Sequence, residues 1–386
     1  MNMAASMQAP SNPVAAPLQL FDCRLPETAI GSLEVPFRAG QLASGPAVTQ
    51  LEKTIETRFP GRHAVAVGDM TNALAMTLRL AGVRQGDEVL SLAFNCMSSN
   101  SAITMTGAQV AWVDVDPGTA SFDIDHARRQ ITSRTRAVVV YHVSGYPADL
   151  AAIRQLCDDH GLPLVEDANN AFGASVANRP VGTVGDFAVF SLYANRQINA
   201  IDGGIVLCAR AEDAEHARRL RRFGIDTARF RDADGEIDPF LDVPEIGMSS
   251  SLNNVHATLA LASLADVQER IARSRRNVAL LTDATRDLPL ISITPVAGAQ
   301  PVYWTWLVRT TDRDTRMRAL KARDVQCSKL HYPNQHYSGF GVAAGNLPGT
   351  DILQRDMLAI PCGWWLDVSD IARLAHIIRD VLQARD

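Results

Sequence analysis

The sequence predicts an α/β fold, in which a large domain with a mostly parallel central sheet precedes a smaller C-terminal α/β domain. Up to about Ala211, short apolar segments alternate with helical ones, a pattern typical of βαβ units. The segment Ala137–Tyr141 (AVVVY) is continuously apolar, as a strand covered by helices on both faces requires. The chain has 386 residues, 47% of them hydrophobic, which suffices for a large core.

The elements of the large domain follow from local patterns. Apolar residues recur with helical spacing from Val48 to Arg58, and Asp69 or Thr71 is a suitable N-cap for a helix that stops at Gly82. The other two expected helices are Ser98–Thr106 and Ala148–His160. The expected strands are Ala64–Val67, Glu88–Leu92, Gln109–Val115, Ala137–Tyr141, Leu162–Glu166, Phe187–Ser191 and Ile205–Cys208.

The pattern changes after about Ala211. We expect a charged helix at Glu212–Phe223, a polar and mobile loop at Thr227–Pro244, one long helix at Val255–Thr285, and strands near Val302–Arg309 and Gln326–Lys329. Residues 1–20, rich in Ala, Pro, Ser and Gln, are expected to form a loose arm. The large domain would then cover residues 21–270 and the small domain residues 271–386.

Composition argues against several classes of protein. The net charge is -5 and no basic block is present, so a nucleic-acid or anionic-membrane partner is not indicated. The six cysteines are scattered without a CxxC pair, which indicates neither a metal site nor a disulfide framework. No signal peptide and no membrane span is visible, so we expect a cytoplasmic protein.

Three polar segments follow expected strands, where open parallel sheets bind ligands. Gly68–Thr71 precedes a helix and offers free N–H groups to a phosphate, although simple capping by Asp69 or Thr71 is the commoner use. The acids Glu166 and Asp167 end a strand, where a carboxylate can hold a protonated ring nitrogen or cap the next helix. Phe190–Arg196 leads into paired glycines, which suits either a close backbone approach to a ligand or a plain connection.

In order and spacing, these segments resemble the DegT/DnrJ/StrS family of sugar aminotransferases, which depend on pyridoxal phosphate (PLP). The resemblance runs from about Leu33 to the C-terminus. The segments that carry it are SGPAVTQLE (44–52), GDMTNAL (68–74), GDEVLSLAFNCMSSNSAI (86–103), YHVSGYPADL (141–150), VEDANNAFGA (165–174), VGDFAVFSLY (184–193), HYP (331–333) and LAIPCGWWLDVSDIARLAHII (358–378).

This resemblance implies an aspartate-aminotransferase-like fold (fold-type I) and a set of cofactor contacts. Asp167 would pair with the pyridine nitrogen, and Asn170 would lie near the ring hydroxyl. Thr71 and Ser191, with the backbone of the turn at Asp69 and Met70, would bind the phosphate. Phe94 and Cys96 lie where an aromatic residue usually stacks on the ring. The family is dimeric, so Ser249 would approach the phosphate of the other subunit.

One departure from the family pattern matters most. Counting from Ser191, Arg196 occupies the position of the lysine that forms the Schiff base with PLP. The chain has only three lysines, at positions 53, 321 and 329, and none lies in a matching motif. A guanidinium is effectively never deprotonated, so Arg196 cannot act as the amine nucleophile. Asp69 and Met70 also replace Ser-Gly, which places a carboxylate beside the presumed phosphate.

Three hypotheses follow. In the first, the protein is an enzyme that binds PLP or pyridoxamine phosphate (PMP) without a covalent link and acts on a keto sugar or a related small molecule. His142, Tyr193 or His331 would then serve as acid or base, although a hydrogen-bonded packing role is the commoner one for each. A sugar nucleotide would be the substrate, and the protein would be a homodimer or a heterodimer with a paralogue.

The second hypothesis is a protein of this fold without catalytic activity, in which Arg196 clamps a phosphate or carboxylate. The third is an aminotransferase in which arginine replaces the lysine by design, to trap an intermediate. The retention of Asp167 and Ser191 favours a site that binds the cofactor.

Overall fold

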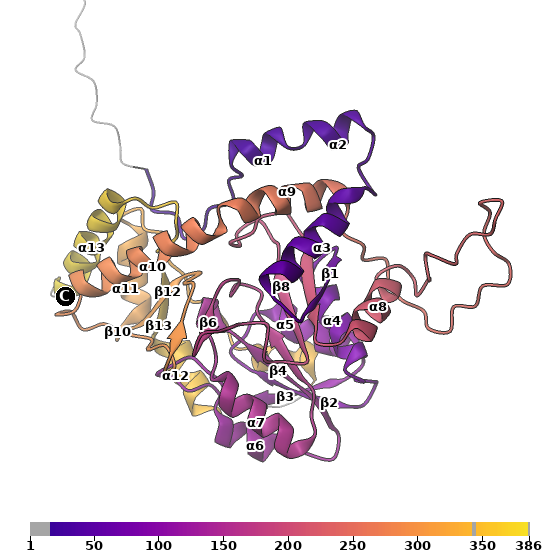
Figure 1. Cartoon of the computed structure of the whole chain (residues 1–386). Helices are drawn as coiled ribbons and strands as arrows, with labels where there is room; N and C mark the ends of the chain where they lie inside the picture. The colour runs from indigo at the N-terminus through magenta and orange to yellow at the C-terminus, as the bar shows by residue number, and fades with distance from the viewer. Residues whose placement is uncertain (1–15, 342–344, 385–386) are drawn as a thin grey trace, which may run out of the picture.

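The computed structural model describes residues 16–341 and 345–384. A seven-stranded sheet forms the centre of the larger part (Figure 1). Its strands lie in the order β1 (His63–Val67), β9 (Gly204–Cys208), β8 (Phe187–Ser191), β5 (Leu164–Asp167), β4 (Thr135–Tyr141), β2 (Glu88–Leu92) and β3 (Gln109–Val113). The pairs from β8 to β3 are all parallel, whereas β9 runs antiparallel to both β1 and β8. The sheet is therefore mainly parallel, as predicted.

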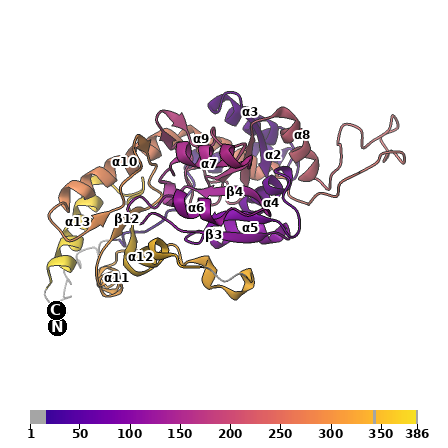
Figure 2. The ribbon, with the colours of Figure 1, turned by 90° about the horizontal axis from the view of Figure 1, so that it is seen from below.

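Helices cover both faces of this sheet (Figures 1 and 2). One apolar cluster contains side chains of α3 (Pro46–Arg58), α6 (Ile124–Gln130), α7 (Leu150–His160) and α9 (Asn254–Ala265). A second contains side chains of α4 (Met70–Leu80), α5 (Met97–Met105) and α8 (Ala211–Leu220). Strands buried from two sides need apolar residues at consecutive positions, and all five residues of β2 and of β8 are buried.

A smaller unit lies to one side of the sheet (Figure 2). Its antiparallel sheet has the order β10 (Ile291–Ser292), β12 (Trp306–Arg309), β13 (Met357–Ile360). The helices α10 (Val267–Ala284), α11 (Arg313–Lys321) and α13 (Val368–Gln383) contribute to its separate apolar cluster together with β12 and β13. The remaining elements are α1 (Glu27–Gly31), α2 (Glu34–Arg38), α12 (Pro348–Asp356), the two-residue strands β6 (Ser175–Val176), β7 (Arg179–Pro180) and β11 (Ala299–Gln300), and the 3₁₀ turns η1 (Val143–Gly145), η2 (Asn334–His336) and η3 (Ser338–Phe340).

The C-terminal part departs from the sequence prediction at two places. The long helix expected at Val255–Thr285 is two consecutive helices, because Asp266 leaves helical geometry and both ends α9 and begins α10. The strand expected at Gln326–Lys329 is wrong. Ser328 forms only a single bridge, to Ala359 of β13, while Val325 bridges to Leu18. Each of these residues pairs with a different segment, so no continuous ladder forms.

Two further segments bear on the expected domain arrangement. Residues 1–15 of the expected N-terminal arm lie outside the described residues, whereas Leu18 is buried in the apolar cluster of the smaller unit. The segment expected as a polar loop at Thr227–Pro244 extends away from the body (Figure 1), and Phe240 within it is 94% exposed.

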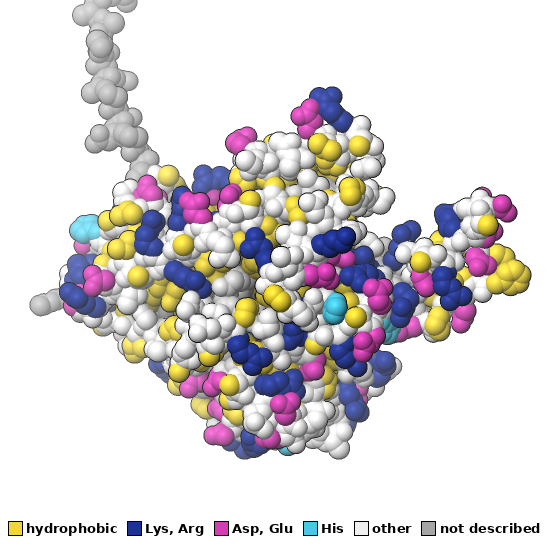
Figure 3. Space-filling model, in the orientation of Figure 1, with side chains coloured by type: hydrophobic (Ala, Val, Ile, Leu, Met, Phe, Trp, Pro, Cys, Tyr) yellow, Lys and Arg dark blue, Asp and Glu magenta, His cyan; other side chains and the backbone are white. Residues whose placement is uncertain are grey.

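On the face of the molecule seen in Figure 3, charges of the two signs are not separated. Figure 3 shows acidic and basic side chains interspersed over the visible face. In the part of the chain that the structure describes, no helix combines the length and apolarity needed to cross a bilayer.

Candidate active site

The sheet register brings the predicted site residues to one edge. Tyr141, the last residue of β4, pairs with Asp167, the last residue of β5, and Asp167 pairs in turn with Val189 of β8. Two residues further on, Ser191 ends β8 and pairs with Gly204, which also pairs with Val67 at the end of β1. The carboxyl ends of four strands thus meet where parallel sheets bind ligands.

The two neighbouring acids of β5 have different environments. Glu166 is fully buried and accepts hydrogen bonds from the backbone N–H groups of Gly182, Val184 and Gly185 at 2.7–2.8 Å. Its Oε2 also lies 3.3 Å from Nε2 of His142. Burial alone would raise the pKa of Glu166, but the hydrogen bonds and charge from His142 and the backbone N–H groups bring it below its usual value. Glu166 is therefore an ionised group that holds the loop after β7.

His142 is fully buried, and both of its ring nitrogens are engaged. Nδ1 accepts a hydrogen bond from the backbone N–H of Ala148 at 3.0 Å, so the ring proton lies on Nε2 and points to Glu166. This is the environment of a hydrogen-bonded packing residue, and no ring nitrogen is left to exchange protons with a ligand.

Asp167 is also fully buried, but one carboxylate oxygen is unpartnered. Oδ1 accepts from the backbone N–H and the side-chain amide of Asn169, at 3.3 and 3.0 Å. Oδ2 has no hydrogen bond of ordinary geometry to a described residue, although the buried Ser99 hydroxyl, itself without another partner, lies close enough to lower the pKa of Asp167. Burial raises the pKa of Asp167 above its ordinary value, against the lowering effect of its hydrogen bonds. A buried carboxylate oxygen without a donor is costly unless a ligand supplies one.

Tyr141 and His331 form a hydrogen-bonded pair beside Asp167. The Tyr141 hydroxyl is fully buried and lies 3.0 Å from Nε2 of His331. It accepts a hydrogen bond from the side-chain amide of Asn170 at 3.1 Å. Burial and the charge of Arg196 lower the pKa of His331 to about 4, while burial raises that of Tyr141. At neutral pH both side chains are uncharged. Asn170 lies in the same group, and its Oδ1 has no partner among the described residues.

Arg196 points into this group of side chains. Its guanidinium carbon lies 4.7 Å from the centre of the Trp304 ring, and its charge acts on Tyr141, Asp167 and His331. Trp304 is fixed by a hydrogen bond from its indole N–H to the carbonyl of Asn195 at 2.9 Å, and by Phe21, which stacks on it at 4.3 Å. Burial lowers the pKa of Arg196. A lowered arginine pKa still leaves the group charged at neutral pH.

The comparisons with known proteins identify the family. The model of the DegT/DnrJ/EryC1/StrS aminotransferase family matches residues 26–379. The chain belongs to this family. AtS13 from Actinomadura melliaura is 30% identical, covering 95% of this chain and 99% of its own, with a TM-score of 0.88. DesV of S. venezuelae, solved in complex with a ketimine intermediate, is 26% identical, covering 96% and 100%, with a TM-score of 0.88. DesI, solved in the presence of its TDP-sugar product, is 27% identical, covering 96% and 94%, with a TM-score of 0.86.

The segment expected to bind phosphate lies at the same sheet edge. Asp69 caps α4, its carboxylate accepting the backbone N–H and side-chain amide of Asn72 at 2.8 and 2.6 Å. This is the capping role that the sequence also allowed. Met70 is buried, whereas Thr71 is half-buried and its hydroxyl has no described partner. The Ser191 hydroxyl accepts the N–H of Tyr193 at 3.2 Å, so its own proton is free to be donated.

Ser249 is exposed and bridges to Arg222 of the same chain. The serines that follow it run beside the end of β1, where the carbonyl of Ser250 accepts the N–H of Gly68 at 2.7 Å. The Ser250 hydroxyl is buried and unpartnered among the described residues. Ser250 is the middle residue of the run Ser249–Ser251, and no local sequence pattern distinguishes it from its neighbours.

The two residues expected near the ring face, Phe94 and Cys96, both neighbour the group around Tyr141 and His331. Phe94 is fully buried and meets His331 edge-on at 6.3 Å, so its ring faces are already in contact with the protein core. Cys96 is half-buried at the start of α5, with Sγ 3.0 Å from the hydroxyl of Ser98. Tyr193 is 49% exposed. Trp304 was missed because it lies far along the chain from the recognised motifs. Among the described residues, no cluster of His, Cys, Asp and Glu suits a metal ion.

Proposed function

We propose that this protein binds PLP or PMP without a covalent link to the chain and acts on a keto sugar, most simply a nucleotide sugar. The unpartnered Oδ2 of Asp167 carries the proposal, because a protonated ring nitrogen would supply the missing donor at this buried carboxylate. Family membership supports the cofactor class, and the ketimine and TDP-sugar complexes of DesV and DesI support the substrate class.

The residues present fit this cofactor at its ring and provide donors for its phosphate. Ser191 has a hydroxyl proton to give, and Thr71 lies in the first turn of the eleven-residue helix α4, where free N–H groups favour an anion. The Asp69 carboxylate already uses one of these N–H groups and adds like charge, so we expect weaker phosphate binding than an uncharged residue would allow. When bound, the cofactor supplies an electron sink next to the substrate carbon.

In place of a lysine, we infer that His331 moves the proton. Arg196 stays protonated, and His142 has no free ring nitrogen, so neither can do so. His331 is uncharged at neutral pH, and its Nδ1, which makes no hydrogen bond to a described residue, is the ring nitrogen that can exchange a proton with a ligand. Tyr141 keeps its own proton because burial raises its pKa, and it holds the ring of His331 through Nε2.

We further propose that two copies form a homodimer in the cytoplasm. The exposed Ser249 and the extended segment with Phe240 are the features of the described chain that suit a contact with a second subunit. Light scattering at several protein concentrations measures the mass directly, and a stable monomer would contradict this part of the proposal.

The decisive test is a titration of the purified protein with PMP and with PLP, in which binding is measured by calorimetry and by the absorbance of the cofactor. We expect saturable binding of both and no borohydride-fixed link at position 196. Asp167→Asn should weaken binding at least about tenfold, because it removes the charge that pairs with the ring nitrogen. Asp314→Asn is the matched control, since Asp314 lies on the surface of α11. If wild type binds neither cofactor, the proposal is wrong.

A further inference from the structure

Arg196 carries a partly buried positive charge without a counter-ion. No described carboxylate lies within ion-pair distance of its guanidinium, and its one side-chain hydrogen bond goes to Oδ1 of the neighbouring Asn195. Arg313 is a buried arginine of the same chain whose guanidinium does have partners. Its Nε pairs with Asp314, and its two terminal nitrogens donate to the carbonyls of Met357 and Gln354. Buried charges are normally compensated, and Asp167 acts on Arg196 only from beyond ion-pair distance, so a ligand can supply the anion that pairs with it directly.

The unused donors of Arg196 lie on one edge of its guanidinium. Nη1 makes the bond to Asn195, while Nε is sealed from solvent and has no partner among the described residues. Nη2 donates no hydrogen bond to a described residue either. Nε and Nη2 together form the flat, two-donor edge that matches the two oxygens of a carboxylate. Trp304, clamped by Phe21 and by Asn195, supports the guanidinium and keeps this edge oriented.

We propose that this edge of Arg196 binds a carboxylate of the substrate, so that the keto sugar is a sugar acid. The inference rests on the proposed function, since it names the substrate class of the same site. The position of Arg196 supports it, because Tyr141 and His331 lie beside the guanidinium and carry no charge at neutral pH. No described acceptor takes a hydrogen bond from Nε or Nη2.

The charges around the edge favour a carboxylate over a phosphate. Arg196 supplies a single positive charge, and the nearby Asp167 is an acid whose negative charge repels a dianion more strongly than a monoanion. Two coplanar donors also match the two oxygens of a planar carboxylate one to one.

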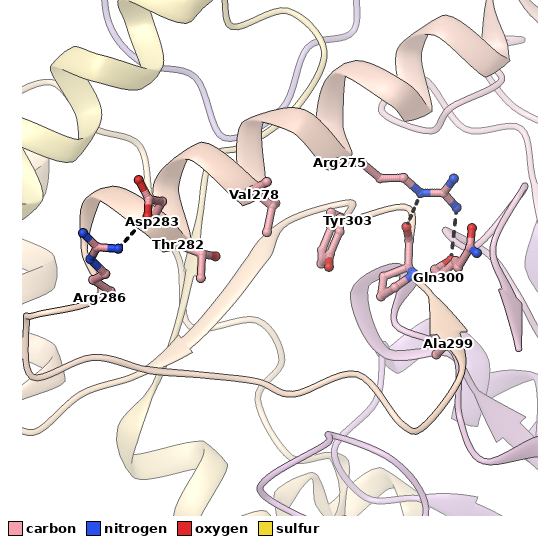
Figure 4. A pocket seen from close by; sticks show the side chains of 10 residues that line it. Arg275, Val278, Thr282, Asp283, Arg286, Ala299, Gln300 and Tyr303 are labelled. Atoms are coloured by element: carbon pink, nitrogen blue, oxygen red, sulfur yellow. Dashed lines mark hydrogen bonds and ion pairs between the residues drawn. The ribbon is translucent and has the colours of Figure 1, made fainter.

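A surface cavity with two arginines on its wall differs from the Arg196 site, because the donors of these arginines already have partners. This cavity of about 710 Å³ lies between α10 and the segment 299–303, with Arg275 and Arg286 on its wall (Figure 4). Arg275 donates to the carbonyls of Pro301, Gln300 and Gly173, and Arg286 pairs with Asp283 at 3.2 Å. Both cations have partners already, so this cavity gives no reason to expect an anion.

The test uses the indole N–H signal of Trp304 in ¹H–¹⁵N NMR spectra of the full chain, assigned with Trp304→Phe. Acetate and acetamide have the same shape but differ in charge, and inorganic phosphate tests the other anion class. We expect acetate to shift the signal saturably and acetamide to leave it unchanged. Arg196→Gln should weaken the acetate response at least about tenfold, the loss of one charged, hydrogen-bonded contact. The acetate response of Arg196→Lys should fall between those of wild type and Arg196→Gln. The response of Arg38→Gln, at an exposed position on α2, should match that of wild type.

An equal response to acetate and acetamide, or an acetate response that survives in Arg196→Gln, would overturn the inference. Tighter binding of phosphate than of acetate would overturn the assignment to a carboxylate. A PMP titration of the same sample separates this inference from the proposed function. Binding of PMP without an acetate response defeats the inference alone, whereas an acetate response without PMP or PLP binding defeats the proposed function alone. Thermal melting of each variant confirms that it is folded.

Discussion

The hydroxyl of Tyr141 donates its proton to Nε2 of His331 across 3.0 Å. The direction follows from the other contacts of the hydroxyl, because Asn170 and the backbone N–H of Ser144 both donate to it, at 3.1 and 3.4 Å. Its single proton is therefore left for His331, whose Nε2 must be the unprotonated nitrogen. In the neutral ring the proton lies on Nδ1, and this nitrogen donates no hydrogen bond to a described residue.

This arrangement predicts how His331 titrates. Burial and the charge of Arg196 lower its pKa to about 4, below the value near 6.5 of a free histidine. In ¹⁵N NMR we expect the Nδ1–H form across neutral pH and a midpoint near that lowered value. Arg196→Gln should raise the midpoint, because it removes the second cause of the shift. A midpoint above about 6 in wild type would contradict the environment described here.

The same shift predicts how the stability depends on pH. The folded-state pKa of His331 is depressed, so its contribution is fully present above about pH 6.5 and is lost as the pH falls towards 4. His331→Gln should remove this part of the pH dependence, which chemical denaturation at a series of pH values would measure. His376→Gln is the matched control, since His376 is a surface residue of α13. Parallel curves for wild type and His331→Gln would show the prediction to be wrong.

Glu166 should contribute strongly to stability. We expect Glu166→Gln to lower the free energy of unfolding by about 2–4 kcal/mol, because a glutamine cannot accept from all three backbone N–H groups and His142. The folded-state pKa of Glu166 is lowered, so the difference from wild type should persist above its unfolded pKa and diminish as the pH falls through the folded pKa. Glu215→Gln on the exposed face of α8 is the control. Equal losses for the two variants would refute the structural role of Glu166.

Much of the large sheet could be predicted from the sequence, because its strands are buried from both sides and their apolar runs are unambiguous. β2 and β8 have the bounds that the sequence analysis gave them. The sequence could not predict that Glu166 holds a loop while Asp167 faces the site. This difference depends on which strand face each side chain occupies and on the loop at Gly182–Gly185. The pairing of Tyr141 with His331 joins residues 190 positions apart, and the role of Trp304 depends on the fold of the smaller unit. No local pattern reports such contacts.

The unpaired charge of Arg196 predicts an unusual response to substitution. Arg196→Met should not lower the free energy of unfolding, because it removes a partly buried cation that lacks a counter-ion, and the lost contact with Trp304 is worth only about 0.5–2 kcal/mol. Arg313→Met should cost about 2–4 kcal/mol, since it leaves the carbonyls of Met357 and Gln354 without their donor. Urea denaturation compares the two variants, and a larger loss for Arg196→Met would contradict the interpretation of its charge.

Replacement of Arg196 by lysine should change the binding of PLP from non-covalent to covalent. An amine at this position can be deprotonated and can attack the aldehyde, whereas the guanidinium cannot. We expect Arg196→Lys treated with PLP and borohydride to carry one cofactor fixed at position 196, identified by mass spectrometry of its peptides. Wild type should carry none there. Its three natural lysines are the internal control, since Lys53 and Lys329 are exposed and Lys329 pairs with Asp314 at 2.8 Å. Labelling of those lysines alone in the variant would show that position 196 does not face the cofactor.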